Sequence, residues 1–270
     1  MAEQLTIMAI HAHPDDEVIG TGGVFARYAA EGIRTVLVTC TNGEQGDAPG
    51  GIKPGEPGHD PNAVGAQRLS ELKESAAVLG IEHVELLGYR DSGMDGWEGN
   101  RHPDAFWNVP VEQSAARLAD LMRRYRPQVV VTYDENGNYG HPDHIQANRI
   151  ALAAAAETGI PDKLYYTAIP RESSREMFET LRANGLIDFD PPEDFGTPMD
   201  EITTFVDVAP YTRRKVKALE AHASQGDSVP FLNLPPDLQQ LIFQTETFIL
   251  HFNRVPTAPA QEDDLFSGLR

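Results

Sequence analysis

The chain is organised around the stretch LTIMAIHAHPDDEVIGTGG at residues 5–23. Its first part, residues 5–10, is a short apolar run of the kind that forms a buried strand. A histidine and carboxylate cluster, HAHPDDE at residues 11–17, follows at once, and a glycine-rich helical pattern comes next. The sequence therefore predicts a strand that delivers metal-binding side chains to its carboxyl end, where open α/β sheets bind their ligands.

Outward from this stretch, short apolar runs alternate with longer segments that have apolar residues at helical spacing. The predicted strands are residues 5–10, 35–40, 83–87 and 129–133, and the predicted helices are residues 17–30, 66–79, 111–125 and 144–157. This alternation is typical of a parallel sheet covered by helices. We predict an α/β fold with a Rossmann-like, mostly parallel sheet and helices on both faces.

The alternation weakens after residue 160, where a strand-like run at 202–206, a basic helix at 211–223 and a strand-like run at 247–252 remain. We predict a core over residues 1–160 that carries the site, a smaller C-terminal part over 161–255 that completes the pocket, and a flexible tail over 256–270. Residues 1–255 are best treated as a single domain. Residues 42–62 and 93–110 are predicted to be long loops, which usually build a site in a compact domain.

Composition excludes several classes of partner. The net charge of −19 arises from 41 acidic and 22 basic residues, so the protein repels phosphate backbones and anionic lipids. We expect a small-molecule substrate, no nucleic acid and no membrane, and the sequence leaves open whether the chain forms a homo-oligomer. The single cysteine, Cys40, excludes an internal disulfide and is expected to be a buried thiol. The first apolar run is too short for a signal or membrane segment, so we expect a cytoplasmic protein.

A second cluster, TYDENGNYGHPDH, occupies residues 132–144 at the end of the fourth predicted strand. Proline at position 142 suits the first position of a helix, which places His141 at the N-cap and His144 three residues later on the same side. If the strand order is 3-2-1-4-5, the first and fourth strands are neighbours. Both clusters then meet at the carboxyl ends of these strands.

Together the clusters provide a ligand set for a metal. His13, Asp16 and His144 offer two nitrogens and one carboxylate oxygen, the set of a catalytic zinc that keeps one position open. Asp15 and His141 remain beside it, and they suit a proton acceptor and a group that stabilises an oxyanion or protonates an amine. Spacing alone leaves open which of the adjacent aspartates binds the metal. Each residue alone is equally well explained as a helix cap or a polar rim residue, but the two clusters jointly favour a metal site.

Other functional classes fit less well. The glycines at 20, 22 and 23 do not match the G-x-G-x-x-G fingerprint of dinucleotide binding. A magnesium-dependent phosphoryl-transfer protein needs oxygen ligands, whereas two converging histidines favour zinc or iron. A non-catalytic ligand-binding module has no need of both Asp15 and His141. Because no G-x-S-x-G elbow is present and Cys40 is expected in the core, we predict hydrolysis without a covalent intermediate.

The motifs HPDDE at 13–17 and HPDH at 141–144 resemble the PIG-L, or LmbE-like, family of N-acetylglucosaminyl deacetylases. Members of that family share a Rossmann-like fold and a zinc site. The segments VVVTY at 129–133, YRDSGM at 89–94 and AHASQ at 221–225 extend the likeness over most of residues 5–255. They are similar to the mycothiol branch, which contains the N-acetylglucosaminyl-inositol deacetylase and the mycothiol S-conjugate amidase.

The resemblance implies zinc on His13, Asp16 and His144, with ferrous iron as the alternative metal. Asp15 would then be the general base, and His141 would stabilise the tetrahedral intermediate with help from the Tyr139 hydroxyl. Two further positions, Arg68 and Asp91, match family residues that hold the sugar-inositol part of the substrate, although each is equally explained as a surface ion-pair partner.

The expected activity is zinc-dependent hydrolysis of the N-acetyl amide of a glucosamine-containing small molecule. The motif continues as VIGTGG at 18–23 and lacks a lysine that we would look for in an S-conjugate amidase, so a deacetylase is favoured and the amidase is the runner-up. His222 stays outside the predicted catalytic set. It either closes the pocket from the C-terminal side or is an ordinary histidine at a helix end, which the helix dipole favours.

Overall fold

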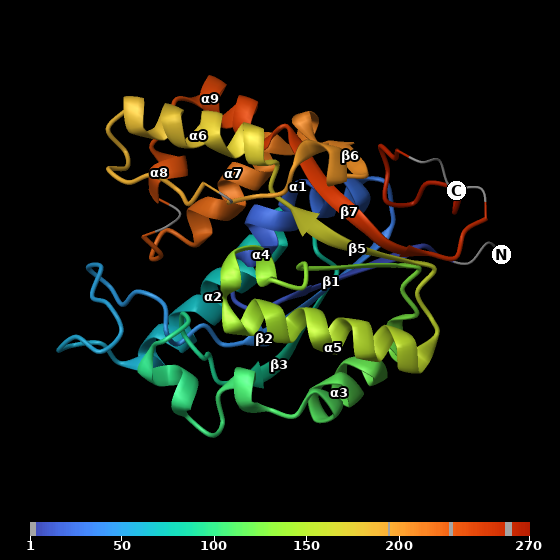
Figure 1. The fold of residues 1–270 in the computed structure, drawn as a ribbon, viewed down its shortest axis with the longest axis horizontal. Coiled ribbons are helices and arrows are strands. Elements are labelled where there is room, and N and C mark those ends of the chain that lie inside the picture. Colours follow the sequence, from blue (N-terminus) through green and yellow to red (C-terminus); the bar gives the residue numbers. More distant parts are fainter. Residues whose placement is uncertain (1–3, 194, 227–228, 257–260) are drawn as a thin grey trace.

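A mixed seven-stranded sheet with the order β3-β2-β1-β4-β5-β7-β6 forms the centre of the molecule (Figure 1). The computed structural model describes residues 4–193, 195–226, 229–256 and 261–270. Strands β1 to β5 are parallel, and β7 pairs antiparallel with both β5 and β6. The strands are β1 Thr6–His11, β2 Arg34–Thr41, β3 His83–Tyr89, β4 Val129–Thr132, β5 Lys163–Ala168, β6 Thr204–Asp207 and β7 Thr245–Asn253.

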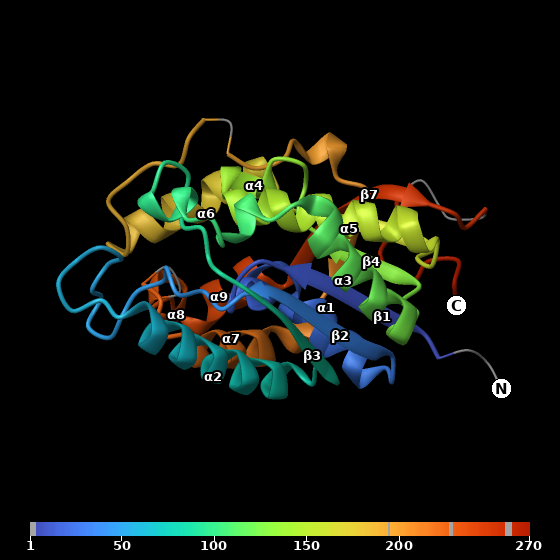
Figure 2. The ribbon, with the colours of Figure 1, turned by 90° about the horizontal axis from the view of Figure 1, so that it is seen from below.

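Helices cover both faces of this sheet, as Figure 2 shows edge-on. Helices α1, α2 and α7 contact one another on one face, and α3 packs along α5 on the other. The short helices α8 and α9 follow α7, and α6 follows β5. The helices are α1 Asp16–Ala30, α2 Pro61–Leu79, α3 Val111–Tyr125, α4 Gly137–Gly140, α5 Pro142–Thr158, α6 Arg171–Ala183, α7 Thr212–Ala221, α8 Val229–Leu232 and α9 Pro236–Phe243.

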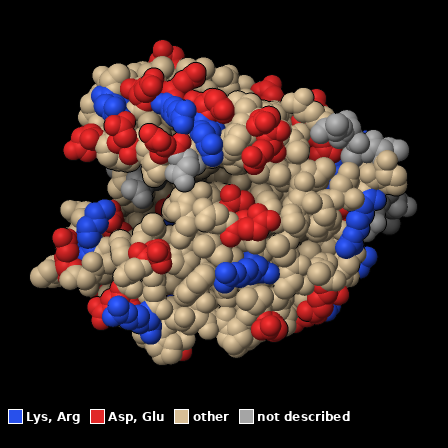
Figure 3. Space-filling model, in the orientation of Figure 1, with Lys and Arg blue, Asp and Glu red and all other residues tan. Residues whose placement is uncertain are grey.

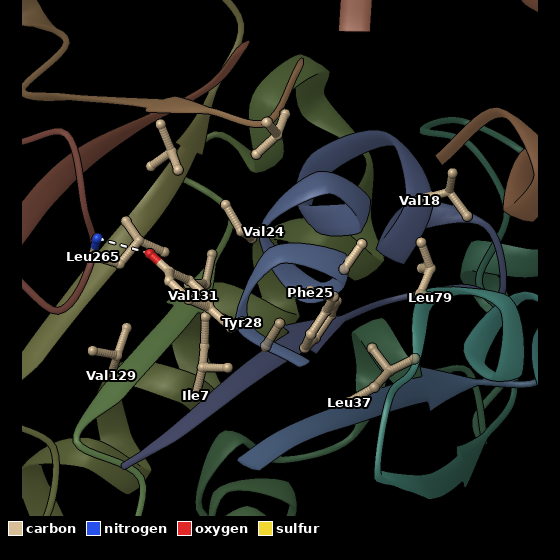
Figure 4. Close-up of a cluster of buried hydrophobic side chains, with 14 of the residues drawn as sticks. Ile7, Val18, Val24, Phe25, Tyr28, Leu37, Leu79, Val129, Val131 and Leu265 are labelled. Atoms are coloured by element: carbon tan, nitrogen blue, oxygen red, sulfur yellow. Dashed lines mark hydrogen bonds between the residues drawn. The ribbon is translucent and has the colours of Figure 1, made fainter. Parts of the chain in front are cut away.

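The strand β1 is buried over its whole length, which explains the apolar run at residues 7–10 within it. Successive side chains point to opposite faces of a sheet. Ile7 accordingly packs in the cluster under α1 with Phe25 and Leu37 (Figure 4), whereas Met8 belongs to the cluster under α3 and α5. One strand therefore contributes to both hydrophobic cores and fixes the sheet between the two helix layers.

The predicted α/β class, the strands and helices of the first half and the strand order 3-2-1-4-5 are confirmed. The basic helix and the two late strand-like runs correspond to α7, β6 and β7. Strand β5 was not among the predicted strands. It begins at Lys163, a charged residue that interrupts the apolar pattern but is fully buried because its ammonium group pairs with Glu262 at 2.5 Å.

The end of the chain differs from the predicted flexible tail. Residues 257–260 lie outside the described residues, but residues 261–270 pack against the core. Leu265 and Phe266 are fully buried, and the Leu265 amide donates a hydrogen bond to the Tyr28 hydroxyl at 2.9 Å (Figure 4). Glu262 also pairs through its backbone with Phe205. Most residues of this segment are polar or small, so its composition did not indicate that Leu265, Phe266 and Glu262 are buried.

The predicted loops 42–62 and 93–110 contain short 3₁₀ turns at Glu98–Arg101 and Phe106–Asn108 and isolated bridges between Ala48 and Ile52 and between Arg90 and Ala105. Helix α2 begins at Pro61, within the last two residues of the first predicted loop. Both loops lie at the carboxyl ends of β2 and β3. Figure 3 shows that the molecule is hollowed between the first loop and the part that carries α6 and α8, and that acidic side chains are widespread on this face. Within the described ranges no helix has the length and apolar content required to cross a membrane.

Candidate metal centre and active site

The two polar clusters meet at one end of the sheet. Strand β1 pairs directly with β4, in register from Ile7 opposite Val129 to Ala9 opposite Val131. The loops that follow these strands are therefore adjacent, and three imidazole rings converge. Their centroids are 4.5 Å apart for His13 and His141, 5.3 Å for His13 and His144, and 4.8 Å for His141 and His144.

These side chains can hold a metal ion. Ligand nitrogens of His13, His141 and His144 all lie within 4.8 Å of one another, and all three residues are buried. The carboxylate of Asp16 reaches between two of them, with its oxygens 3.3 Å from His13 Nδ1 and 3.5 Å from His144 Nε2. Among the described residues, neither ring nitrogen of His144 has a hydrogen-bond partner, and both nitrogens are buried. A buried imidazole with no partner is costly unless an ion occupies the space beside it, so the residues fit a divalent cation.

The electrostatic surroundings also favour a cation. Burial alone would lower the pKa of His13, but the neighbouring Asp91, Asp143 and Asp16 together raise it well above its usual range. Burial lowers the pKa of His144 to about 4. The pKa of Asp16 is raised by burial but falls well below its usual value because His144 and His13 are nearby. The neutral imidazole of His144 and the ionised carboxylate of Asp16 are in the protonation states that bind metals, whereas His13 must release a proton when a metal binds.

Asp143 is a functional candidate to which the sequence analysis assigned no role, although it lies inside the HPDH motif. It is fully buried, and its Oδ2 lies 3.3 Å from His13 Nε2, on the side of the ring that faces away from Asp16. Ser92 donates to Asp143 through its hydroxyl at 2.5 Å and its backbone amide at 2.9 Å. A carboxylate behind a metal-binding imidazole fixes the tautomer and the orientation of the ring.

Asp15 differs from the adjacent Asp16 in backbone and in direction. Its φ is 113°, which is unusual for a residue other than glycine, and although it occupies the N-cap of α1 its side chain makes no capping hydrogen bond. Its Oδ2 accepts instead from Arg68 at 2.9 Å, and the side chain lines the pocket. Burial raises the pKa of Asp15 to about 6, against the lowering effect of Arg68. The helix-cap explanation therefore does not apply to Asp15.

His141 combines two roles. As predicted, it is the N-cap of α5, and its Nδ1 accepts a hydrogen bond from the Asp143 amide at 3.1 Å. When Nδ1 accepts, the hydrogen of a neutral imidazole is on Nε2. Burial, with the charges of His13 and His144, lowers the pKa of His141 to about 2. His141 is therefore a neutral residue whose Nε2–H is available as a hydrogen-bond donor.

A cavity of about 380 Å³ is lined by His13 and His141 of this cluster. Asp15, His141 and the half-exposed Tyr139 line it, as do Arg68 and Asp91. Arg68 and Asp91 are only 5% and 2% exposed, so neither is a surface ion-pair partner. The loops predicted to build a site add further lining residues that the sequence did not single out, namely Gln45, Asp47, Lys53, Met94 and Trp97, and Gln225 comes from the C-terminal part.

His222 does not line this cavity. It is fully buried at the C-cap of α7, and its Nε2 lies 2.8 Å from Oε1 of Glu17, which is equally buried. Burial alone would lower the pKa of His222, but Glu17 raises it above its usual value. Glu17 was not among the predicted site residues. Its long-range partner is 205 residues away in the chain, so no local pattern could have indicated the pair.

Comparisons with known proteins agree with this arrangement. The model of the PIG-L family, described as GlcNAc-PI de-N-acetylase, matches residues 8–155, which include both clusters. A 1D-myo-inositol 2-acetamido-2-deoxy-α-D-glucopyranoside deacetylase of Acidothermus cellulolyticus is 43% identical over 280 residues, covering 98% of this chain and 95% of that protein.

Solved structures share the fold at low identity. The N,N'-diacetylchitobiose deacetylase of Pyrococcus horikoshii has a TM-score of 0.59 at 21% identity and covers 91% of this chain and 83% of its own. The 4-carboxy-2-hydroxymuconate hydratase GalB of Pseudomonas putida also has a TM-score of 0.59, at 20% identity, with 95% and 100% coverage. The fold therefore supports more than one reaction, and the side chains of the site decide between them. From its sequence motifs, its near full-length relatives and its site geometry, the chain belongs to the PIG-L (LmbE-like) family of deacetylases.

Proposed function

We propose that this protein is a zinc-dependent deacetylase that hydrolyses the N-acetyl amide of 1D-myo-inositol 2-acetamido-2-deoxy-α-D-glucopyranoside. The observation that carries the proposal is the pairing, in one cavity, of a carboxylate and a neutral imidazole beside a cluster of metal-ligand side chains. The match to deacetylases of this substrate extends over nearly the whole chain, including the loops that line the cavity.

His13, Asp16 and His144 are the proposed zinc ligands, with ferrous iron as the alternative metal. Two nitrogens and one carboxylate oxygen are a common set for a catalytic zinc. Asp16 is preferred to His141 as the third ligand because its oxygens face both His13 and His144, whereas His141 already uses Nδ1 to cap α5. When bound, zinc supplies Lewis-acid polarisation of the acyl carbonyl and makes water more acidic.

The remaining chemistry falls to side chains of this chain. Asp15 accepts a proton from the attacking water and later delivers it to the leaving amine, a role suited to a carboxylate whose pKa burial raises to about 6. His141 donates its Nε2–H to the oxygen that becomes negative in the transition state. The Tyr139 hydroxyl assists at the same oxygen. Tyr139 lies close to two of the histidines, with its ring centroid 6.3 Å from that of His141 and 5.0 Å from that of His144.

Arg68 and Asp91 are the proposed contacts to the sugar-inositol part, because both line the cavity and both are charged and buried. Replacing Asp91 with asparagine should therefore raise KM more than it lowers kcat, and the metal should remain bound. Steady-state kinetics with metal analysis measure this difference. Loss of metal with unchanged KM would assign Asp91 to the metal centre, since its Oδ1 lies 3.6 Å from His13 Nε2.

The proposed base predicts the pH dependence of the reaction. Only the ionised Asp15 accepts a proton, so kcat/KM should rise with pH and level off above a pKa of about 6. The guanidinium of Arg68 lowers this pKa, so Arg68→Gln should move the acidic limb of the profile to higher pH. The matched control is Lys53→Gln, which removes a cavity cation that pairs with Asp47 instead and should leave the limb in place. A limb that moves to lower pH in Arg68→Gln would contradict the assignment.

The proposed substrate is tested by amine release from three compounds: N-acetylglucosamine, N-acetylglucosaminyl-inositol and a mycothiol S-conjugate. The proposal predicts the highest kcat/KM for N-acetylglucosaminyl-inositol. A higher value for the thiol conjugate would make the protein an S-conjugate amidase. Release from none of the three would exclude this substrate class.

A further inference from the structure

Asp15 is held in an unfavourable backbone conformation. Its φ of 113° and ψ of −31° lie in a region that is unfavourable for a residue with a side chain, and such conformations persist only where surrounding contacts determine them. With this backbone conformation the two adjacent side chains point in different directions. The Asp15 carboxylate contacts Arg68, and the Asp16 carboxylate contacts His13. The contacts that hold the Asp15 backbone therefore determine where the proposed base lies.

The side chain of Glu17 makes one of these contacts. Its Oε2 accepts a hydrogen bond from the Asp15 backbone amide at 2.9 Å. At the other end of the same residue, the Asp15 carbonyl accepts a hydrogen bond from the Val18 amide at 2.9 Å in the first turn of α1. Glu17 is fully buried and does not line the cavity, so it acts on Asp15 through this backbone hydrogen bond and through its charge, which raises the pKa of Asp15.

Two other helices fix Glu17 in turn. Its Oε1 accepts from the Ser75 hydroxyl of α2 at 2.5 Å and lies 2.8 Å from Nε2 of His222 at the end of α7. Ser75 and His222 are both fully buried. A buried carboxylate is strongly disfavoured without partners, so the His222 imidazole and the Ser75 hydroxyl hold this carboxylate in one orientation.

We propose that Glu17, clamped by His222 and Ser75, is the positioning residue that keeps Asp15 aligned for proton transfer. This inference rests on the proposed function, because it requires Asp15 to be the base. It also gives His222 a role: the end of α7 is tied to the active-site turn by the buried contact between His222 and Glu17. The C-terminal part of the chain then contributes to catalysis through the geometry of Asp15.

The test is a double-mutant cycle on the zinc-loaded protein, with kcat and KM for N-acetylglucosaminyl-inositol, metal content and thermal unfolding measured for each variant. Glu17→Ala should lower kcat by about 10²-fold, the cost of a displacement near 1 Å, with KM and metal content unchanged. The double variant Asp15→Asn with Glu17→Ala should have a kcat no lower than that of Asp15→Asn alone. Asparagine at position 15 cannot accept the proton, so its exact placement no longer affects the rate.

Two further variants separate positioning from stability. Glu17→Gln retains an oxygen for the Asp15 amide and should keep more of the parental kcat than Glu17→Ala. Glu246→Gln is the matched control. Glu246 is also a buried carboxylate that ties α7 to α1, through Lys215 at 2.7 Å and the amides of Gly23 and Val24, but it does not touch Asp15. Its substitution should lower thermal stability and leave kcat unchanged.

The outcomes that would overturn the proposal differ from those that would overturn the function. Equal loss of kcat from Glu17→Ala in the parental and Asp15→Asn backgrounds would show a general structural effect. If Glu17→Ala keeps the parental kcat, or if it loses its metal, the positioning role is also rejected. Neither result would contradict the proposed deacetylase function. Parental kcat in Asp15→Asn would reject the proposed base, and the positioning role with it.

Discussion

Asp15→Asn is expected to lower kcat for N-acetylglucosaminyl-inositol by at least ~10²-fold, the usual contribution of a positioned acid–base group. The substitution removes the proton acceptor but preserves the size of the side chain. It should leave the metal bound, because the Asp15 carboxylate contacts Arg68 and does not lie between the histidines. Kinetics together with metal analysis of the purified variant measure both parts of the prediction.

The acidic limb of the pH profile gives a second readout of the same variant. If ionisation of Asp15 produces that limb, the residual activity of Asp15→Asn should no longer fall near pH 6. An Asp15→Asn protein that loses its metal, or that keeps the parental rate and the parental limb, would contradict the assignment of Asp15 as base.

Asp16→Asn is expected to weaken metal binding first and activity as a consequence. The carboxylate of Asp16 faces His13 and His144 at 3.3 and 3.5 Å, and the amide that replaces it is a poor metal ligand. Activity should partly return when zinc is added in excess. Titration of the metal-free variant with zinc, followed by activity, measures the loss of affinity.

Asp143→Asn is the matched comparison for this prediction. Asp143 contacts His13 from the opposite side and is proposed to orient it without binding the metal. Loss of such an outer partner usually costs ~10- to 100-fold in metal affinity or activity. Asp16→Asn should therefore lose more affinity than Asp143→Asn. If Asp16→Asn keeps metal and rate while Asp15→Asn loses the metal, the roles of the adjacent aspartates are reversed.

The half of the fold that holds the site was predictable because its signals are local. Each of the first four strands is a short apolar run, each helix has its own periodicity, and the β1 and β4 ends carry the two clusters. The C-terminal half depends on contacts between distant segments. The charged Lys163 at the start of β5 can be buried because it pairs with Glu262, which lies 99 residues later in the chain. Leu265 and Phe266 are held at the core by their contacts with Tyr28 of α1.

In the candidate site, too, the features with local sequence signals were predictable, and those that depend on backbone conformation or distant contacts were not. Residue type and spacing were sufficient to single out the three histidines and the adjacent pair Asp15 and Asp16 as site candidates. They were insufficient to separate Asp15 from Asp16, because the difference lies in a backbone turn with a φ of 113°. The partners behind these side chains were also missed. Asp143 acts on His13 across 130 residues of chain, and Glu17 meets His222 across 205, so neither relation leaves a local pattern.

The role of a metal is the central claim, and stripping and restoring that metal tests it most directly. The purified protein is analysed for metal, treated with a chelator, and then assayed for acetate release from N-acetylglucosaminyl-inositol before and after zinc is returned. We expect one metal ion per chain, loss of acetate release on chelation, and recovery with stoichiometric zinc. Full acetate release by the metal-free protein would contradict it.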